Sequence, residues 1–168
     1  ATGLLTINTG VTLNDAAPTN AHTLTGGLTI NSTGVCAFTG TVSFAGTLTT
    51  SYNFNSGTLA NPTSMGTAVW TFTAGVTTAM AGGATNARFD FQGDLNINAG
   101  VTTILNNTNF YSTSGSILYL NNASDLRMNG VLGANTNFPE NFGSYVFATT
   151  SIVRYMGAAG QVVRGGPS

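Results

Sequence analysis

The sequence predicts an all-β chain folded as a parallel β-solenoid of about six to seven turns, each of about 23 residues. The first reason is a recurring string of residues. The string alternates apolar and polar residues, reaches an asparagine or threonine, turns at a small residue, and continues into a second short β-prone run. Its copies begin at residues 5, 28, 52, 70, 95 and 118, in steps of 23, 24, 18, 25 and 23. A near-constant period is typical of proteins in which each repeat forms one turn of a solenoid.

The second reason is a scarcity of helix-forming residues. Lysine is absent, glutamate occurs once, and 22 of the 168 residues are glycine. No segment longer than eight residues has the i, i+3, i+4 apolar spacing of an amphipathic helix. A β-sandwich is the alternative all-β fold, because its turns also recur every 8 to 12 residues or so. A sandwich does not require the same string every 23 residues, so we expect the solenoid.

Short alternating runs define the expected strands, and glycines or turn-forming loops separate them. The segment at residues 14–20 is such a loop, rich in Asn, Asp and Pro. Expected strands of the N-terminal half lie at residues 5–7, 11–13, 22–25, 28–30, 35–38, 41–44, 52–54 and 58–59. Expected strands of the C-terminal half lie at residues 70–80, 87–91, 95–97, 101–105, 109–111, 117–120, 126–128, 131–132, 145–147, 152–155 and 161–163.

Stacking of the repeats in parallel places matching positions about 4.8 Å apart. Two inward ladders are expected: Leu5, Leu28, Tyr52, Trp70, Leu95 and Leu118, and then Ile7, Ile30, Phe54, Phe72, Ile97 and Leu120. The next position gives an asparagine ladder of Asn8, Asn31, Asn55, Asn98 and Asn121, with Thr73 in the fourth repeat. Asparagine tolerates a left-handed backbone, and stacked amides can hydrogen-bond to each other. We therefore assign this ladder a structural role at the turns.

The outward position of the string is left free to bind a partner. It reads Thr6, Thr29, Asn53, Thr71, Asn96 and Tyr119 up the predicted stack. Thr-x-Thr runs at residues 23–25, 39–41, 47–49 and 71–73 resemble the threonine ranks of β-solenoid ice-binding proteins. Threonine is also a common solvent-facing strand residue, and Tyr119 would interrupt a flat array.

Composition and residue spacing argue against several other classes of function. Charged residues are 5% of the chain and the net charge is −1, whereas binding to nucleic acid or anionic lipid requires clustered cations. The apolar runs are too short to span a membrane. His22 and Cys36 have no partner at catalytic or zinc-binding spacing. Asp90 and Asp94 flank Gly93, but no further acid lies nearby to act on a sugar or to hold calcium. We expect no catalytic residue, no metal and no cofactor.

The C-terminal segment at residues 151–165 resembles a repeat of long secreted surface proteins of gliding Gram-negative bacteria. The family pattern is S-x-V-x-Y, a small-residue turn, and Q-x-V; the matching residues are Ser151, Val153, Tyr155, Gln161 and Val163. The Tyr-Asn-Leu-rich strand that follows in the family is missing here. The resemblance implies export through the type IX secretion system, a cell-surface or filament location, and a role in adhesion or gliding. It implies no catalytic residue.

We therefore expect one β-solenoid domain over residues 1–168, forming a segment of a longer chain. The expected function is that of a non-enzymatic, extracellular structural or adhesive module. Expected partners are neighbouring domains or copies stacked end to end, surfaces or glycans, and the secretion machinery, with no nucleic acid and no membrane insertion. The alternatives are an ice- or glycan-binding β-solenoid and, third, a polysaccharide-active enzyme.

Overall fold

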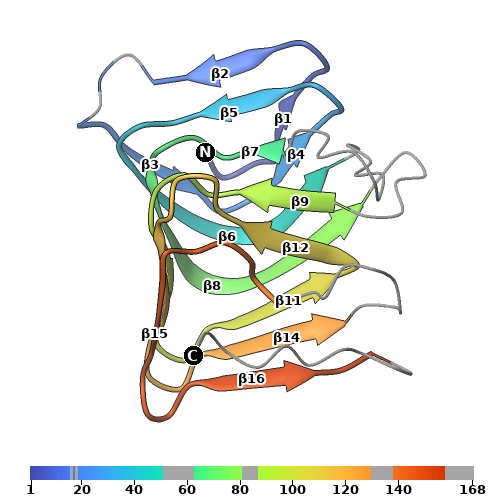
Figure 1. The fold of residues 1–168 in the computed structure, drawn as a ribbon. Helices are drawn as coiled ribbons and strands as arrows, with labels where there is room; N and C mark the ends of the chain where they lie inside the picture. Colours follow the sequence, from blue (N-terminus) through green and yellow to red (C-terminus); the bar gives the residue numbers. More distant parts are fainter. Residues whose placement is uncertain (16, 18, 51–62, 81–86, 130–137, 158–168) are drawn as a thin grey trace.

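The computed structural model describes residues 1–15, 17, 19–50, 63–80, 87–129 and 138–157. These residues form strands joined by turns, and every strand pairing among them is parallel. The strands stack as a β-solenoid of about five turns with about 23 residues per turn (Figure 1). This confirms the predicted fold and repeat length, with a slightly lower number of turns. No described segment forms a helix that could cross a membrane.

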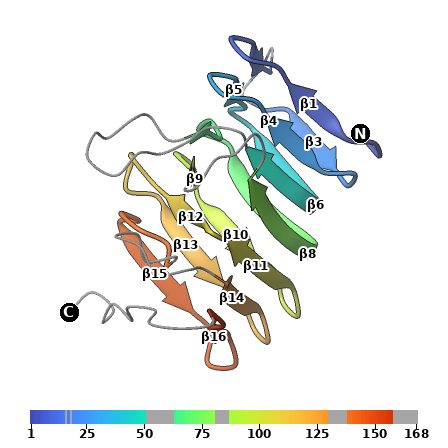
Figure 2. The ribbon, with the colours of Figure 1, turned by 90° about the vertical axis from the view of Figure 1, so that its right-hand side faces the viewer.

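Three faces enclose the core, and each face is a stack of parallel strands. Face A contains β3 (Ala21–Leu24), the first half of β6 (Thr41–Thr50), the first half of β8 (Val69–Met80), β10 (Leu95–Ile97), β13 (Ile117–Leu120) and β15 (Ser144–Phe147). Face B contains β1 (Leu5–Ile7), β4 (Leu28–Ile30), the second halves of β6 and β8, β11 (Thr102–Asn106), β14 (Asp125–Asn129) and β16 (Ile152–Tyr155). Face C contains β2 (Thr12–Asn14), β5 (Val35–Ala37), β7 (Thr63–Ser64), β9 (Ala87–Asp90) and β12 (Thr108–Tyr111). Figure 2 shows the strands of successive turns side by side.

Faces A and B are joined into one 11-stranded sheet by the long strands β6 and β8. Each of these strands passes from face A to face B without a hairpin or a loop. In β6 the register shifts between Phe44 and Gly46, and Gly46 has a φ of 115°. Opposite this step β8 has extra residues, between Phe72 and Val76, and a bulge of this kind bends the sheet while the pairing continues on both sides. Glycine suits the position because a positive φ strains other residues.

An aromatic cluster fills the centre of the solenoid. Phe44, Trp70, Phe72, Phe91 and Phe110 are all fully buried. Their neighbouring ring centroids lie 5.2 to 6.2 Å apart, mostly edge to face. Such pairs each contribute about 0.5–1.5 kcal/mol beyond the area they bury. The Trp70 indole N–H donates to the carbonyl of Met65 at 2.9 Å, so the ring is buried without an orphaned donor.

The predicted inward ladders are correct within each half of the molecule and wrong between the halves. Leu5 pairs with Leu28 as expected, but Leu28 then pairs with Leu48 on face B. Trp70, Leu95 and Leu118 form the predicted ladder on face A, where Trp70 is preceded by Val42. Tyr52, Asn53, Phe54 and Asn55 lie outside the described residues.

The cause is a change in which side of the solenoid the repeated string occupies. The copies that begin at Leu5 and Leu28 lie on face B and turn the corner to face C. The copies that begin at Trp70, Leu95 and Leu118 lie on face A and turn the corner to face B. Because β6 passes from face A to face B in a short step between Phe44 and Gly46, with no loop, Leu48 pairs with Leu28 after fewer residues than a full repeat. The repeated string therefore lies on face B in the first two copies and on face A in the copies that begin at Trp70, Leu95 and Leu118.

Most expected strands in the described residues are present at or near their predicted bounds. The exceptions are β6, which continues to Thr50, and β7, which was not expected. The strands expected at residues 52–54, 58–59, 131–132 and 161–163 lie outside the described part of the chain. The same applies to Gln161 and Val163, two residues of the family resemblance.

Candidate functional site

The predicted outward ladder is divided between two faces. Thr6 and Thr29 lie on face B, where the ladder continues through Thr49 and Ala79. Its other described members, Thr71, Asn96 and Tyr119, lie on face A. There the structure extends the ladder with Thr23 and Ser43 before them and Val146 after them. Asn53 is not described. The predicted residues therefore do not form one continuous surface.

The predicted asparagine ladder is also divided into two pairs. Asn8 and Asn31 lie at the corner between faces B and C, where the Asn31 amide donates to the Asn8 side-chain oxygen at 3.5 Å. Asn98 and Asn121 lie at the corner between faces A and B, and their side chains do not bond to each other. Instead, Asn121 Nδ2 donates to the carbonyl of Ile97 at 3.1 Å.

The backbone role of these asparagines differs from the expected one. Each of the four accepts a hydrogen bond at its carbonyl from the residue three positions later, which closes a tight turn. The left-handed residues are not the asparagines but the turn residues after them: Gly10, Ser32, Gly100 and Ala123, with φ from 41° to 74°. The expectation that asparagine itself takes the left-handed backbone was wrong.

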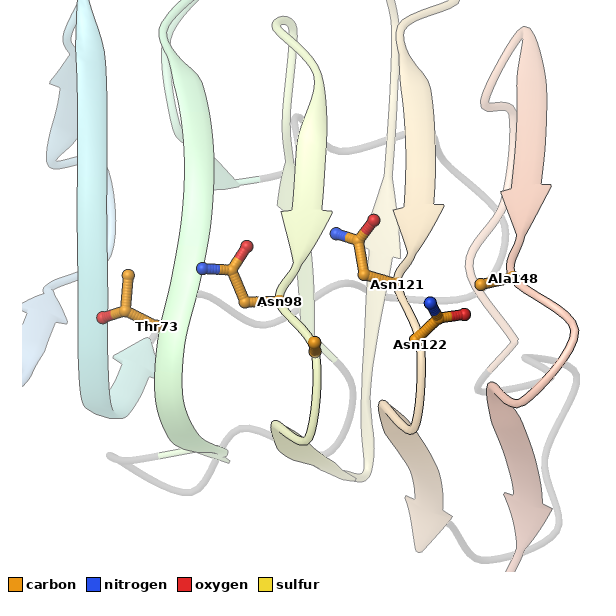
Figure 3. A pocket seen from close by; sticks show the side chains of 6 residues that line it. Thr73, Asn98, Asn121, Asn122 and Ala148 are labelled. Atoms are coloured by element: carbon orange, nitrogen blue, oxygen red, sulfur yellow. The ribbon is translucent and has the colours of Figure 1, made fainter.

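An open hollow of about 540 Å³ lies beside the second pair (Figure 3). Its lining consists of Thr73, Asn98, Ala99, Asn121, Asn122 and Ala148. These residues follow strands of face A in four successive turns, after the first half of β8, after β10, after β13 and after β15. Figure 3 shows the side chains of Thr73, Asn98 and Asn121 in a row across neighbouring strands. We call this hollow the asparagine groove.

The polar groups of the groove are only partly used within the chain. Thr73 Oγ1 donates to the carbonyl of Phe44 at 3.4 Å, and Asn122 Oδ1 accepts from Thr150 at 3.4 Å. The Asn98 side-chain amide has no hydrogen-bond partner within the described part of the protein. No acid or base lines the groove. The arrangement can hydrogen-bond to a neutral ligand but has no charge with which to attract an ion.

His22 lies beside an acid, but the arrangement is not a catalytic triad. Its Nε2 is 3.3 Å from Asp15 Oδ2, and its ring stacks on Phe38 with centroids 4.4 Å apart. Thr39 donates to Asp15 through its hydroxyl at 2.8 Å and through its backbone N–H at 3.1 Å. In a triad the histidine would contact the hydroxyl, whereas here the carboxylate separates the two. These hydrogen bonds connect the turn that contains Asp15 to the next turn.

The hydrogen bonds around Asp15 keep it ionised. Burial raises the pKa of this carboxyl, but the bonds from Thr39, Gly40 and His22 outweigh burial and lower the pKa to about 2. A carboxylate that accepts several N–H and O–H groups resists protonation in this way. Such an acid is a poor proton donor or acceptor near neutral pH, so its geometry favours a structural role.

Asp90 and Asp94 do not form a pair of catalytic carboxylates. Asp90, on face C, accepts from the Thr113 backbone N–H and hydroxyl, both at 2.8 Å, and from Gln92 at 3.1 Å. Asp94 precedes β10 on face A and accepts from the Ile117 backbone N–H at 2.8 Å. Thr113 and Ile117 both belong to the following turn. Each aspartate therefore connects neighbouring turns.

The remaining acids take part in ion pairs. Asp125 accepts from Arg127 on its own strand at 2.8 Å and from Arg154 on the next strand at 3.0 Å. Glu140 pairs with Arg88 at 3.2 Å, and the Arg88 guanidinium also lies 5.3 Å from the centre of the Tyr111 ring. All five acids of the chain are thus bonded to residues of another turn.

Cys36 is fully buried on face C, next to Leu13 of the preceding turn. Burial raises the pKa of its thiol to about 12, so the reactive thiolate is not formed near neutral pH. Among the described residues no group of three or more His, Cys, Asp or Glu side chains is placed to hold a metal ion.

Comparisons with protein-family models, with curated proteins and with solved structures find no match to this chain. The repeat predicted that Asn98 and Asn121 are neighbours, but it did not predict the groove beside them. The available signals were the small residues Ala99 and Ala148, which leave space beside the amides.

Proposed function

We propose that the chain is a non-enzymatic, extracellular structural or adhesive module of a cell-surface or filament protein. One observation carries this proposal: the side chains that could have supplied chemistry are instead used between turns. The carboxylates of Asp15, Asp90, Asp94, Asp125 and Glu140 each bond to a residue of a different turn. A rod that transmits force along its axis benefits from such bonds, because they resist the separation of turns.

The secreted setting is part of the proposal. Its support is the resemblance of residues 151–165 to surface proteins of gliding bacteria that leave the cell through the type IX system. Three of the matching residues, Ser151, Val153 and Tyr155, lie at β16 and the turn before it, so the motif coincides with one solenoid strand. The proposed partners are the secretion machinery and neighbouring domains or copies stacked end to end.

Exposed apolar side chains support the proposal that neighbouring domains or copies stack end to end. Large exposed apolar residues lie in the first described turn and in the last one, with Val69 in β8 as the exception between them. They are Leu4 and Val11 at one end, and Val146, Phe147, Ile152 and Met156 at the other. Unpaired strand edges with apolar neighbours readily accept further strands.

Ice binding has weaker support than a structural role. The face A ladder has hydroxyl residues at Thr23, Ser43 and Thr71 and then continues with asparagine, tyrosine and valine. The bulges of β6 and β8 also bend the sheet where threonines are densest. The enzyme alternative lacks a converging pair of acids among the described residues.

A mechanical measurement tests the structural proposal. The chain is held between handles at its two ends and pulled in an optical trap. Because each turn contacts only its neighbours, we expect stepwise unfolding with extensions of about 80 Å per turn of 23 residues. The chain should also show no hydrolysis of polysaccharide substrates. Unfolding at negligible force would overturn the proposal. It would also be overturned if the chain hydrolyses a polysaccharide and the variant Asp90→Asn loses that activity.

The proposed location is tested separately. An antibody against the module should label intact cells that make the natural protein, and labelling should be lost when the type IX translocon is deleted. Labelling only after the cells are opened would contradict an extracellular role.

A further inference from the structure

The asparagine groove has a repeat of its own, which follows from the stacking of the turns. Its polar side chains come from equivalent positions of successive turns, first Thr73, then Asn98, then Asn121 with Asn122. Neighbouring strands of a sheet lie about 4.8 Å apart, so the row from Thr73 to Ala148 spans about 14 Å. A ligand that lies along this row meets a hydrogen-bonding side chain at each of the first three turns and the methyl group of Ala148 at the fourth (Figure 3).

The chemistry of the lining selects a neutral polar ligand. Each asparagine amide offers two donor hydrogens and an acceptor oxygen, and the threonine adds a hydroxyl. The two alanines add methyl groups to the lining, with Ala148 at the end of the row. An anion would need arginine or lysine, and a cation would need carboxylates or carbonyls in a tighter shell; neither set of side chains lines the groove. Sugars combine hydroxyl groups with apolar C–H faces and so match both kinds of lining group.

The Asn98 amide distinguishes this corner from the corresponding corner in the first two turns. At that other corner the Asn31 amide is bonded to Asn8. At the groove the Asn98 side-chain amide has no hydrogen-bond partner among the described residues. The same string therefore forms a closed corner in one place and an open one in the other.

We propose that the asparagine groove binds a neutral, extended oligosaccharide that lies along the solenoid axis. Successive sugars of an extended β-linked chain repeat at a distance close to the spacing of the turns, so each sugar faces one turn. This inference deepens the proposed adhesive function, on which it rests, by naming the chemistry of the surface that the module contacts. The groove is an open hollow, so we expect weak affinity for one chain, and repeated modules would strengthen attachment.

Titration with defined sugars tests the proposal. Cellotetraose and chitotetraose are added to the isotopically labelled chain, and amide chemical shifts are followed by NMR. We expect at least one of them to shift the signals of residues 98–100 and 121–123, and a tetramer to bind more tightly than a dimer. The charged analogue tetragalacturonate should bind more weakly. The absence of saturable shifts with both neutral tetramers would overturn the inference.

Variants locate the binding. Asn98→Ala and Asn122→Ala should each weaken binding roughly two- to tenfold, the effect of one hydrogen bond. Asn31→Ala is the matched control, because it removes the same side chain from the closed corner and should leave binding unchanged. Loss of binding in Asn96→Ala or Tyr119→Ala, with no effect of Asn98→Ala, would place the sugar on the outward ladder of face A and overturn the groove assignment.

The outcomes also separate this inference from the structural proposal. If the chain unfolds stepwise under force and no sugar binds, the structural role stands and the groove assignment fails. If a sugar binds and is hydrolysed, the non-enzymatic proposal fails while the groove assignment stands.

Discussion

Leu28 and Leu48 are register partners in the parallel strands β4 and β6, and both side chains are fully buried. Their separation in sequence is shorter than the period of the repeats, because β6 reaches face B in a short step at Gly46, without a loop. This pairing sets the arrangement of the molecule. It places the first two copies of the repeated string on face B and leaves face A to the later copies.

Cross-linking tests this pairing. Thr29 and Thr49 are neighbours one position after Leu28 and Leu48. Paired strands place Cα atoms about 5 Å apart, within the range of a disulfide. The double variant Thr29→Cys/Thr49→Cys should therefore oxidise readily, and Cys36 should not compete because it is fully buried. In the control Thr29→Cys/Thr71→Cys the two cysteines lie on different faces, B and A, so this variant should stay reduced. Cross-linking of the control instead would contradict the observed register.

The sequence was sufficient to predict the type of fold. In each copy of the recurring string, such as residues 5–7 and 28–30, one side of the strand is apolar and a turn follows the strand. Parallel stacking of the copies is the simplest way to bury the apolar side of every strand. The same string did not specify a face. Because Leu28 and Leu95 have similar neighbours in sequence, only the packing of the residues between them decides which side of the core each one lines.

The candidate site was predictable in part for a related reason. The adjacency of Asn98 and Asn121 followed from the period. The open space beside them depends on the side-chain partners of each corner, and these differ between Asn31 and Asn98 although the string is the same. The bonds that the acids make across turns could not be predicted, because those partners lie about one full turn away in sequence.

Acid should weaken the fold through Asp15. The folded-state pKa of this carboxyl is lowered to about 2, below its usual value of 3.8. Because the folded-state pKa is lowered, the stability that the ionised Asp15 carboxylate contributes is complete above about pH 4 and is lost as the pH falls towards 2. Urea unfolding of the native chain and of Asp15→Asn should therefore show a clear difference in stability at pH 5 that disappears near pH 2. An equal difference at both pH values would contradict the assigned hydrogen bonds.

Gly93 should be intolerant of a side chain. A Cβ there would lie 2.2 Å from the carbonyl oxygen of Ala68 and 2.4 Å from that of Thr67, which are backbone atoms of the neighbouring turn. Gly93→Ala should lower the free energy of unfolding by about 2 kcal/mol or more. The matched variant Gly75→Ala meets its nearest atom at 3.9 Å and should change stability by less than about 0.5 kcal/mol. Chemical denaturation of both variants measures the difference; similar stabilities would contradict the close approach of turns at Gly93.

We propose that the acids of this chain hold its turns together and take no part in catalysis. Asp90 is the strongest case, because it is 3% exposed and accepts two hydrogen bonds of 2.8 Å from Thr113 of the next turn. The deciding measurement is the free energy of unfolding of Asp90→Asn in urea, with Thr113→Val and the double variant completing a mutant cycle. Hydrogen bonds to a charged group contribute about 1.5–3 kcal/mol, so we expect a loss of that size and clear coupling between the two positions. Unchanged or increased stability in Asp90→Asn, as for a residue maintained for activity at the expense of stability, would contradict the claim.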